Sequence, residues 1–439
     1  MDHILETNSG LQPQCKSDAQ VGDRAGKKHR GWKSCSVVAL ALLWILNWVS
    51  VLPLITSPNH PGTQDFSIFY TGAKIVLSGL SSHLYDLSVQ AHYQTAPYQS
   101  HPLPFDHPAY ELALFLPLSA LSFNAAYGTW VAINVAMVLL TALLLSAHLP
   151  NFPRPAALWA FAAAMASFPL IWSLCQGQDS ILLLLLFVLV YVNLKAGKDP
   201  IAGIILAAGL FKFTLVVPFL VPFLLRRRWR FLAGFLAGSA LAAGISIFMT
   251  GIAGSREYIQ LLSLLTAHPS VGYINLFLMP NVRGFLLTLL TGHGVHRQDF
   301  EIFSAIVSVL LLIFPSLTFC GRDQSEKFEL WFGLNLTIAA LVSPHLYWHD
   351  LTVLLFPLLL VANTLLKSGN RVDFRSVAAS IWIFAYASAW PVWPPYISAL
   401  RVVSPSIFFL PLCGFAVLLA IRVRSLPPIP AVVSSPEIA

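Results

Sequence analysis

The chain has 439 residues, of which 56% are hydrophobic and only 10% are charged. A typical soluble domain carries about 25% charged residues, so this composition excludes a water-soluble globular protein. Apolar runs of about 20 residues recur along the chain, which excludes disordered, collagen-like and coiled-coil proteins. The net charge of +7 does not indicate nucleic-acid binding, because the basic residues lie in short clusters between apolar runs. The composition is that of a polytopic membrane protein.

Twelve segments are apolar enough to be candidate transmembrane helices, although the second is short. They lie at 36–56, 109–122, 124–147, 155–174, 178–195, 200–225, 231–250, 300–319, 328–343, 350–366, 375–391 and 404–421. The predicted fold is all-α, a bundle of about 12 transmembrane helices that forms one membrane-embedded domain over 34–424. The polar or Pro- and Ser-rich ends, 1–33 and 425–439, are predicted to be disordered cytoplasmic segments.

The basic residues orient this bundle. With the N-terminus in the cytoplasm, the alternation of spans places 17 basic residues inside and eight outside, and leaves Lys212 within a span. Because short cytoplasmic loops carry an excess of Lys and Arg, this bias favours two cytoplasmic termini and a multi-pass protein of the inner membrane. Arg154, Lys195 and Lys198 are among the eight residues expected outside.

Two long segments, 57–108 and 251–299, are then expected on the outer face. They carry helix-like stretches, which we expect to lie at the membrane interface, at Phe66–Leu77, Glu257–Leu265 and Phe285–Leu290.

Asp65 stands in the first outside segment, about nine residues after the first span and just before several aromatic residues. A carboxylate at that interface could act as a general base on a substrate hydroxyl. The alternatives are a solvated loop residue or an N-cap for the helix that begins at Phe66.

Lys212 is the one basic residue predicted well inside a span, about 18 Å from either end at 1.5 Å per residue. An ionisable side chain at that depth is costly, which favours a functional role such as binding a lipid phosphate. The alternative is a structural ion pair within the bundle. Gln176, Gln178 and Asp179 follow a span at a turn expected to be cytoplasmic, and are a weaker signal.

His345, His349 and Asp350 lie at the outer end of the ninth and tenth spans. Imidazoles can hydrogen-bond a phosphate, and Asp350 could fix the tautomer of one of them. The alternatives are an interfacial belt of His, Trp and Tyr, or a zinc site on the two histidines, which Pro344 disfavours. Arg283, in the second outside segment, could clamp a phosphate, although a single loop arginine is usually solvated.

The five cysteines show no CxxC pair and no metal-like spacing. The sequence also has no Walker motif and no dinucleotide-binding glycine pattern. We therefore expect no metal site and no cofactor.

Several short motifs, taken in this order, resemble glycosyltransferase family 87, the polyprenyl-phosphate-mannose-dependent mannosyltransferase-like proteins of the C-type superfamily. The matching positions are Asp65–Ala73, Ser78-Gly79, Leu84–Asp86, Pro117–Leu121, Trp130, Asn134, Gly177-Gln178, Ala202-Gly203, Lys212, Arg226–Arg230, Ser343-Pro344 and Trp348–Asp350. The chain departs from the family pattern at His107-Pro108-Ala109, where Tyr-Pro-Pro is usual, and at Asn281-Val282-Arg283, where Asn-Gln-Ser is usual.

The resemblance implies a membrane enzyme that takes a hexose, with mannose expected, from a polyprenyl-phosphate donor on the outer face. Asp65 matches the general base, which would deprotonate the acceptor hydroxyl of a glycolipid or glycan as it attacks with inversion. Lys212 and His349 match groups near the donor phosphate, to which we add Arg283. We expect Tyr70, Tyr85, His107, His345 and Asp350 to support the site or bind the acceptor. Such a scheme needs no metal, and membrane lipid is the other expected partner.

Two alternatives remain open from the sequence. A transporter or lipid flippase would use Lys212, His345 and His349 to line its path. A degenerate family member could act as a scaffold. The polar residues gather near one face, with Lys212 as the main exception, and this distribution favours the enzyme.

Overall fold

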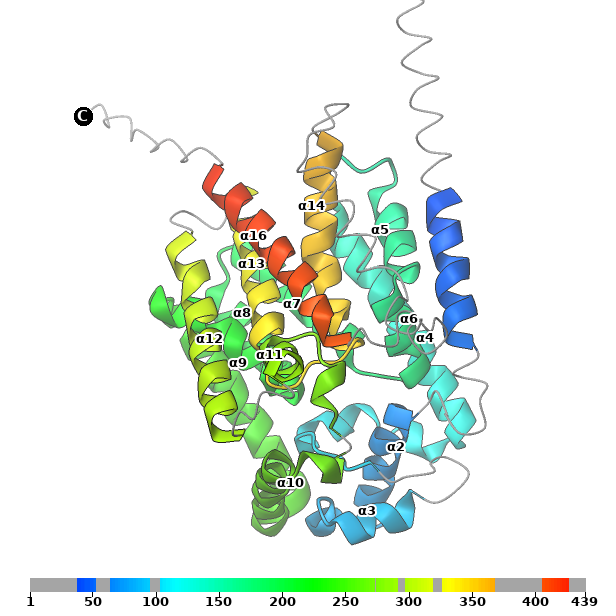
Figure 1. Ribbon diagram of the computed structural model, residues 1–439. Coiled ribbons are helices and arrows are strands. Elements are labelled where there is room, and N and C mark those ends of the chain that lie inside the picture. Colours follow the sequence, from blue (N-terminus) through cyan, green and yellow to red (C-terminus); the bar gives the residue numbers. More distant parts are fainter. Residues whose placement is uncertain are drawn as a thin grey trace, which may run out of the picture.

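The computed structural model describes residues 38–52, 64–94, 103–272, 274–290, 297–318, 326–367 and 405–425. Every regular element in these ranges is an α-helix or a 3-10 helix, as the predicted all-α class requires (Figure 1). The predicted span at 375–391 and the predicted disordered end 1–33 lie outside the described ranges. Of the other predicted disordered end, 425–439, only Ser425 is described, as the last residue of α16 (Phe409–Ser425).

Three helices within the described ranges are long and apolar enough to cross a membrane, or five if each of two bent pairs forms one span. The long helices are α4 (Phe123–Ser146), α10 (Trp229–Ala267) and α12 (Arg297–Thr318). The bent pairs are α5 (Ala156–Met165) with α6 (Phe168–Gln176), at 67°, and α8 (Asp199–Ala208) with α9 (Phe213–Leu225), at 63°. The shorter helices of the bundle are Val38–Leu52, α7 (Ser180–Lys195), α13 (Glu326–Val342), α14 (Leu355–Lys367) and α16 (Phe409–Ser425).

The bundle has two ends, which α13 connects. Near the start of α13, Lys195 Nζ donates to Glu329 Oε1 at 2.5 Å. Beyond the last residue of α13, the carbonyl of Ser343 accepts a hydrogen bond from Asn281. The helix between them is about 20 Å long at 1.5 Å per residue. We call these the Glu329 end and the Asp65 end, since Asp65 lies beside the loop after Ser343. In Figure 1 the Asp65 end, with α2 (Gln64–Leu77) and α3 (Leu87–Tyr93), is the lower one.

The predicted span at 109–122 is wrong. This segment forms two 3-10 helices, η2 (Ala109–Leu114) and η3 (Leu118–Ala120), separated by a turn. Pro108 and Pro117 precede them, and a proline cannot donate the backbone hydrogen bond that a continuous helix needs. Both turns pack against α2 (Gln64–Leu77), where Phe69 and Phe115 stack with ring centroids 4.6 Å apart. The segment therefore stays at the Asp65 end.

Removing this span changes the direction of the helices that follow. The first residue of α4, Phe123, contacts Phe66 with ring centroids 5.5 Å apart, so α4 starts at the Asp65 end. The bent pair α5–α6 returns there, because Gly177 lies directly against Phe66. Gln176–Asp179 thus lies beside Asp65, and its predicted position on the opposite side of the membrane from Asp65 is wrong.

The same correction moves three basic residues to the Glu329 end. Lys195 pairs with Glu329 there, and Lys198 follows it in the turn before α8. Arg154 lies three residues after Asn151, whose backbone N–H donates to Asn363 near the end of α14. All three residues therefore lie at the opposite end from Asp65 and not among the eight basic residues expected outside. This change strengthens the charge bias between the two ends.

The predicted single span at 200–225 is also wrong. Arg228, just after α9, donates to Asp199 at the start of α8 with a shortest N···O distance of 2.8 Å, so the two ends of the bent pair lie together. The pair turns back through η4 (Leu210–Lys212), and Lys212 has the non-helical angles φ −108° and ψ 55°. Lys212 consequently lies at the tip of a re-entrant hairpin and not at the centre of a helix.

Helix α10 combines the predicted span at 231–250 with the helix-like stretch Glu257–Leu265, and it bends at Gly251, where φ is +70°. Its first half packs closely on α8, since a Cβ on Gly203 would lie 2.1 Å from the Phe231 carbonyl oxygen. The predicted stretch Phe285–Leu290 lies within α11 (Val282–Leu290).

The remaining elements are η1 (Ser81–His83), η5 (Pro269–Gly272), η6 (Leu276–Leu278), η7 (Asp350–Leu354) and η10 (Pro405–Phe408).

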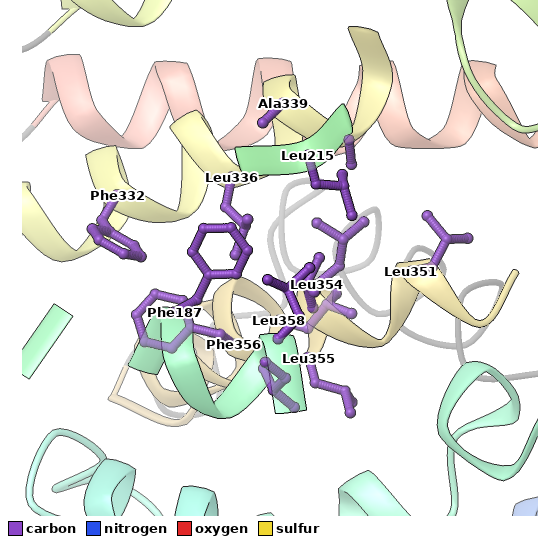
Figure 2. Close-up of a cluster of buried hydrophobic side chains, with 14 of the residues drawn as sticks. Phe187, Leu215, Phe332, Leu336, Ala339, Leu351, Leu354, Leu355, Phe356 and Leu358 are labelled. Carbon is purple, nitrogen blue, oxygen red and sulfur yellow. The ribbon is translucent and has the colours of Figure 1, made fainter. Parts of the chain in front are cut away.

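A continuous apolar core fills the bundle between its two ends. Figure 2 shows Phe187 of α7, Leu215 of α9 and Phe332 of α13. Beside them lie Leu354, the last residue of the 3-10 helix before α14, and Phe356 of α14. These side chains are fully or almost fully buried in one cluster. The core begins close to Lys212 and Asp350, and so forms an apolar floor beneath the polar groups of the Asp65 end.

Candidate active site

A cavity of about 910 Å³ opens at the Asp65 end. Its polar wall comes from α2, the segment before η2, the turn after α6, η4, α11 and the loop between α13 and η7. The polar lining residues are Asp65, Asp106, His107, Gln176, Gln178, Lys212, Thr214, Thr266, Arg283, His345, Tyr347 and His349. Apolar side chains line the remainder, among them Phe168, Trp172 and Trp348 and a group of leucines from α10 and η6. The cavity therefore offers both charged and hydrophobic surface.

Asp65 lies in the first turn of α2 and is half-buried. It is the second residue of the helix, so its position differs from the predicted alternative of an N-cap before Phe66. Its Oδ2 accepts a hydrogen bond of 2.7 Å from Gln178 Nε2, which fixes the carboxylate at the cavity wall.

Lys212 is buried, and its ammonium has three oxygen neighbours. Its Nζ lies 3.0 Å from Asp350 Oδ1, 3.2 Å from Asp179 Oδ1 and 3.2 Å from Gln178 Oε1. The ion pair, one of the two alternatives drawn from the sequence, is therefore formed. Lys212 also lines the cavity, so the phosphate-binding alternative stays open. Gln178 connects Lys212 to Asp65 through its two amide atoms.

His349 and His345 line the cavity from the loop after α13. His349 Nδ1 lies 3.2 Å from Gln176 Oε1, and its Nε2 lies 3.5 Å from Asp350 Oδ1. Burial lowers the pKa of both imidazoles below its ordinary value, although the carboxylate of Asp350 opposes that shift. Both rings are therefore neutral at pH 7, and each can donate one hydrogen bond and accept one.

Asp350 lies behind this wall and holds the loop in place. Its Oδ2 accepts a 2.9 Å hydrogen bond from the Tyr347 backbone N–H, and its Oδ1 accepts one of 3.1 Å from Ser180 Oγ. Its contact with His349 is consistent with the predicted role in orienting that imidazole.

His107 joins the same wall, and two buried carboxylates lie behind it. His107 Nδ1 lies 2.6 Å from Glu111 Oε2 and 3.4 Å from Asp179 Oδ2. Burial alone would lower the pKa of His107, but Glu111 and Asp179 raise that pKa to about 9. Burial raises the pKa of Glu111, and the charge of Asp179 adds to that rise. This group of residues therefore attracts positive charge.

The other predicted site residues are farther from the cavity or already paired. Arg283 lines the cavity, and its guanidinium donates to Glu301 Oε1 at 2.5 Å and to the Pro344 carbonyl at 3.2 Å. Tyr70 donates to the Leu121 carbonyl, and Tyr85 donates to the His107 carbonyl, which holds that residue in place. Neither tyrosine is among the residues that line the cavity.

From the sequence, Gln178 and Asp179 were only a weaker signal, and Glu111 had no predicted site role. The glutamine and Asp179 were expected at the opposite end of the bundle, and Glu111 was expected inside a span. One signal could have identified them. Glu111 and Pro117 within the 14 residues 109–122, with Pro108 directly before them, argue against a transmembrane helix there.

A family model for glycosyltransferase family 87 matches residues 105–344. This range includes His107, Asp179, Lys212 and Arg283, while Asp65 and His349 lie outside it. No curated protein and no solved structure matches the chain. The match covers more than half of the sequence, and it agrees with the apolar helical bundle and with a cavity that carries a carboxylate and several cationic or hydrogen-bonding groups. The chain belongs to glycosyltransferase family 87 and is a membrane glycosyltransferase, which uses a sugar donor and a glycan acceptor.

Proposed function

We propose that this glycosyltransferase transfers a hexose, mannose, from a polyprenyl-phosphate donor to a hydroxyl group of a glycan or glycolipid. The reaction takes place on the outer face of the inner membrane, where the Asp65 end lies, and both termini are cytoplasmic. The observation that carries this proposal is the cavity itself, because Asp65 shares its lining with several side chains that can bind a phosphate and with an apolar surface.

Asp65 is the general base in this proposal. Gln178 donates to its Oδ2, which leaves Oδ1 to receive the proton of the acceptor hydroxyl. The acceptor oxygen forms a bond to the anomeric carbon as the bond from that carbon to the phosphate oxygen breaks. The sugar configuration inverts in this single displacement, and polyprenyl phosphate leaves with the electron pair. The residue after Asp65, Phe66, is fully buried against Phe115 and Phe123, so the base stands on a fixed helix.

The donor phosphate binds near Lys212, His349 and Arg283. Lys212 already has three oxygen neighbours, so a phosphate oxygen replaces one of them, and the neutral amide of Gln178 is easier to displace than either carboxylate. The neutral His349 ring has one N–H, which turns from Gln176 Oε1 to the phosphate. Arg283 exchanges part of its contact with Glu301 for the phosphate. These groups stabilise the charge that develops on the leaving phosphate.

The polyprenyl chain lies along the apolar lining of the cavity. Leu262 and Leu265 of α10 and Leu276 of η6 supply this surface. Burying hydrocarbon there gives about 0.8 kcal/mol per CH₂, so a few isoprene units are enough to hold the lipid.

A transporter or flippase is the other function considered from the sequence. Its substrate would need a path from the cavity toward the Glu329 end. The apolar floor of Figure 2 occupies that direction, with Phe187, Phe332 and Phe356 fully buried among leucines. This packing supports the enzyme over the transporter.

The test is sugar transfer from polyprenyl-phosphate-mannose by the purified protein in nanodiscs. Asp65→Asn keeps the size of the side chain and the bond to Gln178 but removes its basicity, so transfer should fall at least about a hundredfold. Asp86→Asn is the matched control, since Asp86 caps α3 in the same segment and asparagine caps equally well. Near-normal transfer by Asp65→Asn, or an equal loss in both variants, would remove Asp65 from the base role.

A further inference from the structure

His107, Glu111 and Asp179 bring three metal-binding atoms together. One side-chain nitrogen or oxygen from each lies within 4.8 Å of those of the other two. His107 lies two residues before η2, Glu111 lies in the first turn of η2, and Asp179 precedes α7. The side chains of Glu111 and Asp179 are fully buried, and that of His107 is 11% exposed where it reaches the cavity.

The buried charges around this group do not balance. Three buried carboxylates, those of Glu111, Asp179 and Asp350, share one ammonium, that of Lys212. Even with His107 protonated, one negative charge is left over among the ionised groups. An uncompensated buried carboxylate is strongly unfavourable, so the site needs a further proton or a bound cation.

Oxygen atoms in the group also lack hydrogen bonds. Glu111 Oε1 and both carboxylate oxygens of Asp179 are buried and accept no hydrogen bond from the described residues. Asp179 has only its charge contacts with Lys212 and His107. Buried carboxylate oxygens are normally hydrogen-bonded or bound to a cation.

The surroundings hold the imidazole in the orientation of a metal ligand. The Tyr85 hydroxyl donates to the His107 carbonyl at 3.0 Å, and Phe69 packs edge-on against the His107 ring at 5.2 Å. His107 Nδ1 faces the two carboxylates. One imidazole nitrogen and two carboxylates suit a divalent transition cation such as Mn²⁺ or Zn²⁺ better than Mg²⁺ or Ca²⁺, which prefer oxygen ligands alone.

We propose that His107, Glu111 and Asp179 bind one divalent transition cation at the wall of the cavity. The cation replaces the proton on His107 and supplies the positive charge that the carboxylates lack. Asp179 then contacts both cations: its Oδ2 binds the metal, and its Oδ1 keeps its ion pair with the Lys212 ammonium. The metal thus positions Lys212 for the donor phosphate, a role that rests on the proposed function, whereas metal binding does not. This proposal replaces the expectation of no metal, which came from residue spacing and could not detect ligands from two separate segments.

The test is Mn²⁺ binding to the full-length protein, purified in detergent and stripped with EDTA. Electron paramagnetic resonance and equilibrium dialysis should show one Mn²⁺ per chain, displaced by Zn²⁺. Glu111→Gln should weaken the affinity at least about a hundredfold, because loss of a second-shell partner alone costs ten- to a hundredfold. Glu329→Gln is the matched control, since it removes a paired carboxylate at the opposite end and should leave binding unchanged.

A second readout covers the case in which Glu111→Gln fails to fold. Adding Mn²⁺ to the stripped wild-type protein should raise its unfolding temperature, because a ligand that binds only the folded state stabilises it. No bound Mn²⁺ or Zn²⁺ at millimolar concentration, or equal binding by Glu111→Gln and wild type, would overturn the proposal. Bound metal without sugar transfer would instead count against the proposed function.

Discussion

The two ends of the bundle each hold a cluster of charged side chains, and the clusters differ in balance and burial. At the Glu329 end, one carboxylate lies beside Lys195 and His148, and the three side chains are 15–20% exposed. At the Asp65 end, Lys212 lies between Asp179 and Asp350, which are at most 1% exposed, with Glu111 close behind. The first cluster is balanced and partly wet, whereas the second has excess negative charge and faces a cavity.

The two clusters differ in the role that their charges can have. A balanced pair near a helix end costs little and fixes the position of the helix in the membrane. An unbalanced buried cluster is unfavourable by itself, and such groups are typical of sites that bind a charged partner. We therefore propose that the reaction takes place at the Asp65 end and that the charged pairs of the Glu329 end orient the protein in the membrane.

The largest expected contrast is between the two lysines. Lys212→Met leaves two buried carboxylates without their cation, so the free energy of unfolding should fall by about 3–5 kcal/mol and sugar transfer should be lost. Lys195→Met at the partly exposed pair should cost no more than about 1 kcal/mol. Thermal unfolding in detergent measures both. The double variant Lys212→Met/Asp350→Asn should be more stable than Lys212→Met alone, and a double variant that is less stable would contradict the ion-pair account.

Two glycines give a similar contrast in backbone geometry. Gly177 and Gly197 both have positive φ, +66° and +72°. A Cβ on Gly177 would lie 2.6 Å from Phe66 Cβ, whereas a Cβ on Gly197 would meet nothing within 4 Å. Gly197→Ala should therefore cost about 1–2 kcal/mol, and Gly177→Ala about 3 kcal/mol together with displacement of Asp65. Unfolding temperatures and transfer rates of the two variants test this, and equal losses would mean that the contact with Phe66 is unimportant.

The hydrogen bond between Gln178 and Asp65 should have a smaller effect. Gln178→Leu removes the donor that fixes the carboxylate, so transfer should fall about tenfold, the equivalent of one hydrogen bond to a charged group. Asn193→Leu is the control, because the Asn193 side chain donates to the Leu189 carbonyl on the same helix, toward the Glu329 end. Unchanged transfer by Gln178→Leu would show that α2 alone positions the base.

The smallest expected effect concerns pH. Burial lowers the pKa of His349, so the folded protein keeps this ring neutral while the unfolded chain takes up a proton below about pH 6.5. The stabilisation is therefore complete above that pH and is lost as the pH falls toward the folded pKa, by at most about 1.4 kcal/mol per pH unit. His349→Gln should reduce the loss of unfolding temperature between pH 6.5 and 5, and the exposed His92→Gln should not. Identical pH profiles for wild type and His349→Gln would contradict it.

Much of the fold was predictable because apolar periodicity and length are local properties. The helical class and helix α2 followed directly from residue type. The errors came from counting every apolar run as a crossing. The segment 109–122 is apolar yet lies at one end, and the segment 200–225 turns back at Lys212. Each error reversed the direction of the chain, and together they cancelled, so that the Arg226–Arg230 cluster kept its predicted side.

The site was partly predictable for the same reason. Asp65, His107, Lys212, Arg283, His345 and His349 were named from residue type and motif, and all of them line the cavity. Glu111 and Asp179 could not be grouped with them, since their proximity depends on which end of the bundle each turn occupies. That property belongs to the whole topology, and a single wrong span is enough to hide it.

The most direct test of the central claim is an experimental structure of the protein in nanodiscs with a non-transferable polyprenyl-phosphate-sugar analogue. The account predicts the phosphate within hydrogen-bonding distance of Lys212 and His349, the anomeric carbon toward Asp65, and the lipid chain along Leu262 and Leu265. A phosphate bound at the Glu329 end beside Arg226–Arg230, or a sugar that points away from Asp65, would contradict it.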